Sequence, residues 1–141
     1  MGRIVAIDYG TKRVGLAVTD PLKIIATALD TVHAKDVLAY LEKYHRAETI
    51  ETFVIGMPVQ MDSNIESENA KYVKQFINRL KKVLPEIPIV LEDERFTSKM
   101  AQDAMLRGGM KKKDRQNKAN VDKISAVLIL QSFMEKENFQ K

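Results

Sequence analysis

The chain has 141 residues, of which 45% are hydrophobic and 30% charged, and this composition is typical of one globular domain over residues 1–141. The formal net charge of +4 permits a polyanionic partner, and the lack of cysteine excludes disulfides and thiolate-bound zinc. With only two histidines, any metal is expected to be a hard cation held by carboxylates. No apolar run is long enough to cross a membrane, and a cytoplasmic protein is expected.

The N-terminal part of the sequence predicts three strands, over residues 3–7, 14–19 and 24–29. Short turns join these strands, so they are expected to form an antiparallel meander. Gly15, inside the second strand, would permit a bulge or the close approach of another group. Apolar residues at helical spacing then predict a helix over 37–44.

The rest of the chain alternates strands and helices, which favours parallel pairing. Strands over 52–55 and 89–91 flank an amphipathic helix that ends near Val83 and follows a capping box, Ser63-x-x-Glu66. A further helix is expected to stop at Gly108, and a last helix to run from about 120 to 138. This order predicts an α/β fold with a mixed five-stranded sheet flanked by helices.

Acidic residues stand at the ends of predicted elements, where plain surface charge is not expected. Asp8 ends the first strand, and Asp93 and Glu94 end the last one. Asp122 lies in the first turn of the final helix, where the small Ser125 would allow close contact with the sheet. Parallel neighbouring strands end at the same edge, so these carboxylates can converge there. Converging carboxylates repel unless cations lie between them, and two Mg²⁺ or Mn²⁺ ions are the usual arrangement for phosphodiester cleavage.

Each acidic position also has a structural explanation when it is taken alone. Asp8 could accept hydrogen bonds from its own turn, and residues 92–95 could be a solvated strand end with a local ion pair. Asp122 could stabilise the N-terminus of its helix through the helix dipole. The agreement of all three positions with one site favours the catalytic interpretation.

Four stretches of the sequence, spread over residues 3–133, resemble in order the signatures of the YqgF (RuvX) family: IDYGTKRVGLAVTD, VIGMPVQMD, DERFTS and VDKISAVLILQ. Members of this family are described as Holliday-junction-resolvase-like and as pre-16S rRNA nucleases, and they have the RNase H-like fold. The resemblance implies metal-dependent hydrolysis of a nucleic-acid phosphodiester. It implies acidic positions at Asp8, in the Asp93-Glu94 pair and at Asp122. Ser63 departs from the family pattern, which often has glycine there.

We therefore predict an RNase H-like nuclease in which Asp8, Glu94 and Asp122 hold Mg²⁺ or Mn²⁺, with Asp93 as the alternative to Glu94. Processing of the 5′ end of pre-16S rRNA is the favoured role, and cleavage of branched DNA junctions is the alternative. Candidate phosphate contacts are hydroxyl or basic residues near the predicted site. They are Thr11, Lys12, Arg13, Arg95, Lys111, Lys112 and Lys113.

Two interpretations come from other classes of protein. An actin-like sugar kinase or ATPase also carries an Asp-x-Gly-Thr phosphate loop, but it needs two such domains with ATP between them. A non-catalytic RNA- or ribosome-binding module would keep the fold without the chemistry, and a metal-dependent cleavage assay distinguishes it from a nuclease. The sequence leaves the oligomeric state open between a monomer and a weak dimer.

Overall fold

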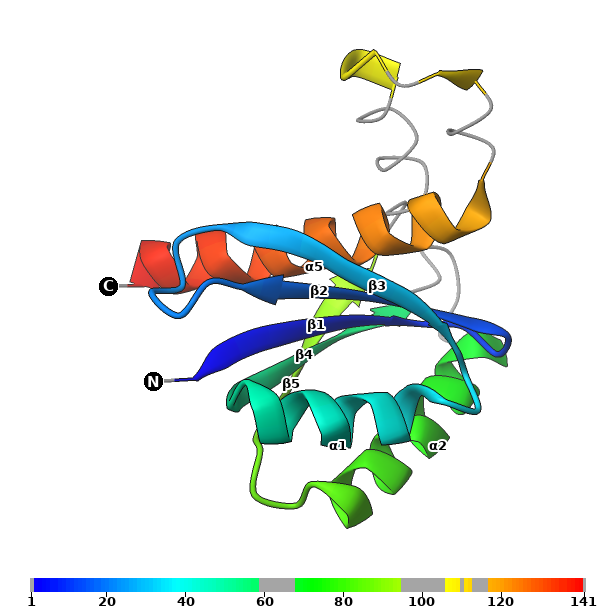
Figure 1. Ribbon diagram of the computed structural model, residues 1–141, viewed down its shortest axis with the longest axis vertical. Helices are drawn as coiled ribbons and strands as arrows, with labels where there is room; N and C mark the ends of the chain where they lie inside the picture. The colour runs from blue at the N-terminus through cyan, green and yellow to red at the C-terminus, as the bar shows by residue number, and fades with distance from the viewer. Residues whose placement is uncertain (1, 59–67, 95–105, 110, 113–116, 141) are drawn as a thin grey trace.

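The protein is built around a five-stranded mixed sheet in the order β3-β2-β1-β4-β5 (Figure 1). The computed structural model describes residues 2–58, 68–94, 106–109, 111–112 and 117–140. β1 pairs antiparallel with β2, and β2 with β3, whereas β1–β4 and β4–β5 are parallel. The predicted mixed sheet is confirmed. The strands are β1 (Arg3–Tyr9), β2 (Arg13–Thr19), β3 (Ala26–His33), β4 (Ile50–Pro58) and β5 (Ile89–Glu94), and the helices are α1 (Val37–Ala47), α2 (Glu68–Val83) and α5 (Lys118–Gln140).

The third strand begins later than the sequence predicts. Oδ1 of Asp20 accepts hydrogen bonds from the backbone N–H groups of Ile24 at 2.7 Å and Ile25 at 2.8 Å. These bonds hold Ile24 and Ile25 in a loop. The strand predicted over 24–29 therefore begins at Ala26 and continues to His33, as β3. The predicted capping box at 63–66, and most of the helix expected before Gly108, lie outside the described residues.

Helices cover both faces of the sheet, and alternation along β1 decides which helix each residue meets. Figure 1 shows α5 across one face and α1 and α2 against the other. Val5 and Ile7 pack in the core formed with α1 and α2, whereas Ile4 and Ala6 pack under α5. Asp8 follows Ile4 and Ala6 at the same parity, so β1 places it on the face that α5 covers.

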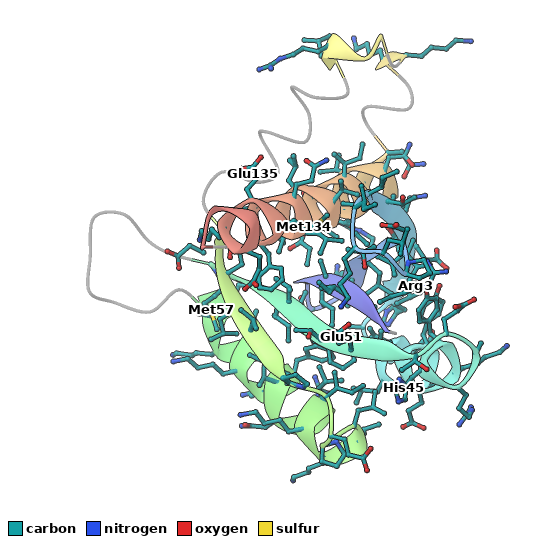
Figure 2. The ribbon with its side chains drawn as sticks, turned by 90° about the vertical axis from the view of Figure 1, so that its left-hand side faces the viewer. Arg3, His45, Glu51, Met57, Met134 and Glu135 are labelled. Atoms are coloured by element: carbon teal, nitrogen blue, oxygen red, sulfur yellow. The ribbon has the colours of Figure 1, made fainter. Side chains whose placement is uncertain are left out.

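α5 contacts all five strands of the sheet. Its buried stripe includes Ala126, Ile129 and Leu130, which pack against apolar residues of β1, β2 and β4. Figure 2 shows Met134 on the sheet side of this helix and Glu135 directed away from it. Within the described ranges, none of the helices combines the length and the apolar character that a membrane span requires.

Candidate active site

The N-terminal part of α5 rests directly on β2 at Gly15. Gly15 pairs with Asp8 in the antiparallel ladder between β1 and β2. A Cβ added to Gly15 would lie 2.0 Å from the carbonyl oxygen of Asp122 and 3.1 Å from its Cβ. Only a residue without a side chain permits this approach, so the close contact predicted for Gly15 is confirmed. Gly15 thereby brings Asp122 beside the strand position that pairs with Asp8.

Further contacts fix the first turn of α5 over the sheet. The Thr31 hydroxyl of β3 donates a hydrogen bond to the carbonyl oxygen of Ala119 at 2.7 Å. Ser125 and Ala126 are both fully buried, as expected for small residues at a close contact. Among the described residues, the Ser125 hydroxyl has no hydrogen-bond partner. The small size of Ser125 therefore explains its place at this contact better than its hydroxyl does.

Asp122 forms an ion pair with Arg13 across the start of β2. Arg13 Nε donates a hydrogen bond to Asp122 Oδ2 at 2.8 Å, and the side chains are 41% and 20% exposed. Arg13 precedes Gly15 by two residues and therefore lies on the same face of β2. In this structure the guanidinium of Arg13 is the cation at the carboxylate of Asp122, and its Nε–H is the donor that this contact engages.

β5 contributes a buried carboxylate, Glu92, which is not evident from the sequence pattern. Glu92 is 4% exposed and accepts hydrogen bonds from Ser132 Oγ at 2.8 Å and Lys136 Nζ at 2.6 Å, both on α5. The hydrogen bond and charge of Glu92 raise the pKa of the Lys136 ammonium. Glu92 therefore anchors the C-terminal half of α5. The spacing of Ser132 and Lys136, one helical turn apart, was the available signal for this contact.

The two acidic residues predicted at the end of β5 are adjacent, so their positions have opposite parity along the strand. Asp93 is exposed and shares the parity of Ile89, which packs on the α1–α2 side. Glu94 pairs with Pro58 through its backbone and has the parity of Glu92, and its side chain lies outside what the structure describes.

The structure thus places one of the four predicted acidic residues, Asp122, over the strand position that pairs with another, Asp8. Asp93 is exposed at a position with the parity of the opposite face of the sheet. Among the described side chains, no group of three or more His, Cys, Asp or Glu residues is arranged to hold a metal ion. Any third carboxylate of the site therefore has to come from a side chain that is not described, and Glu94 is the predicted one.

The family of the chain is established by comparison over nearly its whole length. Residues 2–136 match the family model RuvX, which is described as Holliday junction resolvase. The chain belongs to the RuvX family. A relative from Phocaeicola vulgatus is 53% identical over 139 residues and covers 99% of each chain. One from Amoebophilus asiaticus is 51% identical over 137 residues, covering 95% of this chain and 94% of its own. Both are named "Putative pre-16S rRNA nuclease".

Solved resolvase structures share the fold of this RuvX chain. Thermus thermophilus RuvC in complex with a Holliday junction substrate has a TM-score of 0.55 at 20% identity, covering 97% of this chain and 96% of its own. Fowlpox virus resolvase with Holliday junction DNA has a TM-score of 0.58 at 12% identity, covering 95% and 97%. At such identities the similarity establishes the fold alone, and it confirms the predicted RNase H-like architecture.

The predicted phosphate contacts of the RuvX chain lie in two segments. Thr11 and Lys12 are exposed in the turn between β1 and β2, close to Asp8 in the chain. Lys111 and Lys112 are exposed in the segment before α5. Of the other three predicted contacts, Arg13 is paired with Asp122, and Arg95 and Lys113 lie outside the described residues.

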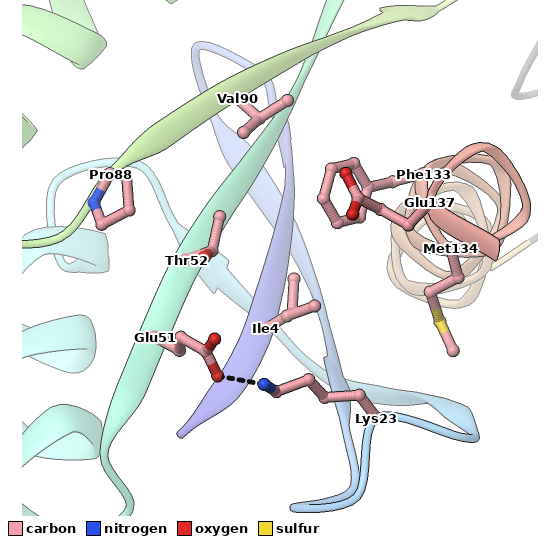
Figure 3. A pocket seen from close by; sticks show the side chains of 9 residues that line it. All are labelled: Ile4, Lys23, Glu51, Thr52, Pro88, Val90, Phe133, Met134 and Glu137. Atoms are coloured by element: carbon pink, nitrogen blue, oxygen red, sulfur yellow. Dashed lines mark ion pairs between the residues drawn. The ribbon is translucent and has the colours of Figure 1, made fainter. Parts of the chain in front are cut away.

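A separate hollow of about 350 Å³ lies at the opposite end of β1, away from Asp8 (Figure 3). Its lining includes Ile4 of β1 and also Phe133 and Met134 of α5. These two residues lie in the C-terminal half of α5, far from Asp122. Lys23 and Glu51 form an ion pair at this hollow. Since these two charges neutralise each other and no acidic cluster is present among the described lining residues, we assign the hollow no part in the RuvX site.

Proposed function

We propose that this RuvX protein is a divalent-metal-dependent nuclease that processes the 5′ end of pre-16S rRNA in the cytoplasm. The observation that carries the proposal is the close packing of Asp122 on Gly15, the residue paired with Asp8. This packing supports a site in which the two carboxylates share one edge of the sheet. The names of the relatives support rRNA as the substrate, because the sequences of these relatives match this chain over nearly its whole length.

The residues at this edge fit a hard divalent cation. Asp8 and Asp122 supply carboxylate oxygens, the ligands that Mg²⁺ and Mn²⁺ prefer, and the chain has no cysteine to select a softer metal. We propose Glu94 as the third ligand in preference to Asp93, because position 94 has the parity that faces α5. When bound, such an ion supplies an activated water and stabilises the leaving oxygen.

The basic residues would hold the substrate in this proposal. Carboxylates repel phosphates, so a nucleic-acid strand at Asp8 and Asp122 needs cations beside it. Thr11 and Lys12 offer exposed donors in the turn that follows Asp8. Their part is to orient the backbone of the strand, and they take no part in the bond cleavage.

A cleavage assay on two substrates tests the proposed function. A transcript spanning the 5′ end of 16S rRNA and a four-way DNA junction are incubated with the protein in Mg²⁺, Mn²⁺ or EDTA. We expect cleavage of the RNA near the mature end in either metal and none in EDTA. If only the DNA junction is cleaved, the function is junction resolution and the proposal of rRNA processing is wrong. If neither substrate is cut although both bind, the protein is a binding module.

Mn²⁺ is expected to raise the melting temperature through the same carboxylates. Ligand that binds only the native state stabilises it by RT ln(1 + [L]/Kd), about 2.7 kcal/mol at a hundredfold excess over Kd. The rise should be larger with a non-cleavable oligonucleotide, because substrate phosphates complete the metal shell. The measurement is thermal melting against Mn²⁺ with and without the oligonucleotide. The metal site is wrong if neither series responds and Asp122→Asn changes nothing.

The lysines before α5 are expected to grip the nucleic-acid backbone without acting in the chemistry. Replacing Lys111, Lys112 and Lys113 by alanine should flatten the slope of log K against log salt by about 2, since each phosphate contact contributes roughly 0.7 to 0.9. The rate at saturating substrate should stay near that of the wild type, because uniform binding is what is lost.

A second triple variant serves as the control for this prediction. It replaces three exposed lysines of α2, on the other side of the sheet, and removes the same charge: Lys71, Lys81 and Lys82. Its salt slope should stay at the wild-type value. Equal slopes in both variants would mean that the lysines before α5 are merely solvated.

A further inference from the structure

Arg13 occupies the position beside Asp122 where the proposed function requires a metal cation. The hydrogen bond from Arg13 Nε to Asp122 Oδ2 is 2.8 Å long and joins residues 109 positions apart in the chain. The ion pair supplies positive charge where two carboxylates, those of Asp8 and Asp122, come near each other. In the absence of metal, such a counter-charge lowers the repulsion between them.

The Arg13 side chain can rotate away from Asp122 without moving the backbone of Asp122. The backbone of Asp122 is fixed by its packing on Gly15, and Thr31 holds the preceding turn through Ala119. The Arg13 side chain is 41% exposed and belongs to the first residue of β2, so it can rotate into solvent. The ion pair is therefore a contact that can open without repacking the core.

We infer that Arg13 is an exchangeable counter-ion of Asp122 that competes with the divalent metal and turns to the substrate phosphate when the metal binds. This inference rests on the proposed function. A guanidinium released at this edge lies next to Thr11 and Lys12, both exposed. Its planar set of N–H donors matches two phosphate oxygens at once. Arg13 is thus a positioning residue whose partner depends on the metal.

Lys12 provides the comparison that isolates the direct contact from the general effect of charge. It is exposed, adjacent to Arg13 and carries the same charge, and among the described residues it pairs with no carboxylate. Lys12→Gln and Arg13→Gln therefore remove equal charge from the same turn. Only Arg13→Gln also removes the competitor of the metal. Arg13→Lys keeps the charge in case the glutamine variant folds poorly.

The first measurement is the affinity for Mn²⁺ without nucleic acid. It is obtained from the electron paramagnetic resonance signal of free Mn²⁺, which falls as the protein binds the ion. Arg13→Gln is expected to bind Mn²⁺ about three- to fivefold more tightly than the wild type, the range that partly exposed ion pairs support. Lys12→Gln should change the affinity by less than about twofold. Arg13→Lys should lie close to the wild type. When Asp122→Asn is already present, adding Arg13→Gln should not increase the affinity for Mn²⁺.

Binding of a non-cleavable RNA in EDTA and in Mn²⁺ is the second measurement. In EDTA, Arg13→Gln should bind RNA as the wild type does, because the arginine is engaged with Asp122. In Mn²⁺ the same variant should lose about one phosphate contact, so the salt slope falls by roughly 0.7. Lys12→Gln should show the same loss in both conditions.

The possible outcomes separate this inference from the proposed function. Mn²⁺ that binds the wild type and Arg13→Gln equally, or the variant more weakly, overturns the exchange and leaves the metal site standing. Mn²⁺ that binds neither the wild type nor Arg13→Gln, with or without the non-cleavable RNA, overturns both, and so does Mn²⁺ binding that Asp122→Asn leaves unchanged. An Arg13→Gln defect in RNA binding that is equal in EDTA and Mn²⁺ also overturns the exchange, because Arg13 would then contact RNA regardless of the metal.

Discussion

Replacing Asp8 by asparagine is expected to abolish cleavage, by at least about 100-fold, while leaving the metal-free fold intact. Loss of an outer partner of a metal ligand already costs 10- to 100-fold, so loss of a ligand should cost more. Asp8 and Asp122 carry like charge at one edge of the sheet, so removing one charge should not lower the stability of the protein without metal. The measurements are the cleavage rate in Mg²⁺ and thermal melting in EDTA.

Asp93→Asn is the control for this prediction. Asp93 lies near the same edge but has the parity of the opposite face, so this variant should retain most of its activity. A large loss of melting temperature for Asp8→Asn in EDTA would show that Asp8 has a structural role in its turn. An equal loss of activity in both variants would show that overall charge, and not position, matters.

Replacing Gly15 by alanine is expected to cause a large loss of stability, because among the described glycines an added Cβ makes its closest contact here. The new Cβ would lie 2.0 Å from the carbonyl oxygen of Asp122, which belongs to the backbone and cannot rotate away. Overpacking of this kind costs about 1–3 kcal/mol, and we expect the upper end. The melting temperature should fall by roughly 10 °C. Cleavage should fall as well, because α5 must lift Asp122 away from Asp8.

Ser125→Ala tests whether volume is the cause. This residue lies in the same contact between α5 and the sheet, and its buried hydroxyl has no partner among the described residues. Removing that hydroxyl should leave the melting temperature unchanged or raise it slightly, since no hydrogen bond is lost. If Gly15→Ala melts like the wild type, α5 is not held as closely to β2 as the structure places it.

The sequence predicts the sheet well because each strand carries a clear hydrophobic pattern. β1 is almost wholly apolar up to Asp8, and the change from short turns to helical connections correctly predicted where pairing becomes parallel. The start of β3 could not be predicted from this pattern, because Ile24 and Ile25 are as apolar as strand residues. The side chain of Asp20 takes their N–H groups and leaves both residues exposed in a loop.

The candidate site is predictable in part for a similar reason. Asp8 and Asp122 stand at element ends, and Gly15 and Ser125 are small enough to indicate a close contact, so their proximity could be expected. The ion pair of Arg13 with Asp122 could not be expected, because it joins distant segments and depends on the direction of one long side chain. The burial of Glu92 was missed as well, since its partners lie on another element.

The contact between Gly15 and α5 also has a consequence for the order in which the molecule gains its activity. Contacts between residues far apart in the chain form late in folding, since closing such a long loop costs entropy before the contact repays it. The pairing of β1 with β2 is local in the chain. Asp122, by contrast, lies 109 positions after Arg13, its partner on β2. A chain whose sheet has already formed would therefore remain inactive until α5 docks. A partial opening that lifts only the N-terminal part of α5, including Asp122, would likewise stop the chemistry and leave the α1–α2 side of the core intact.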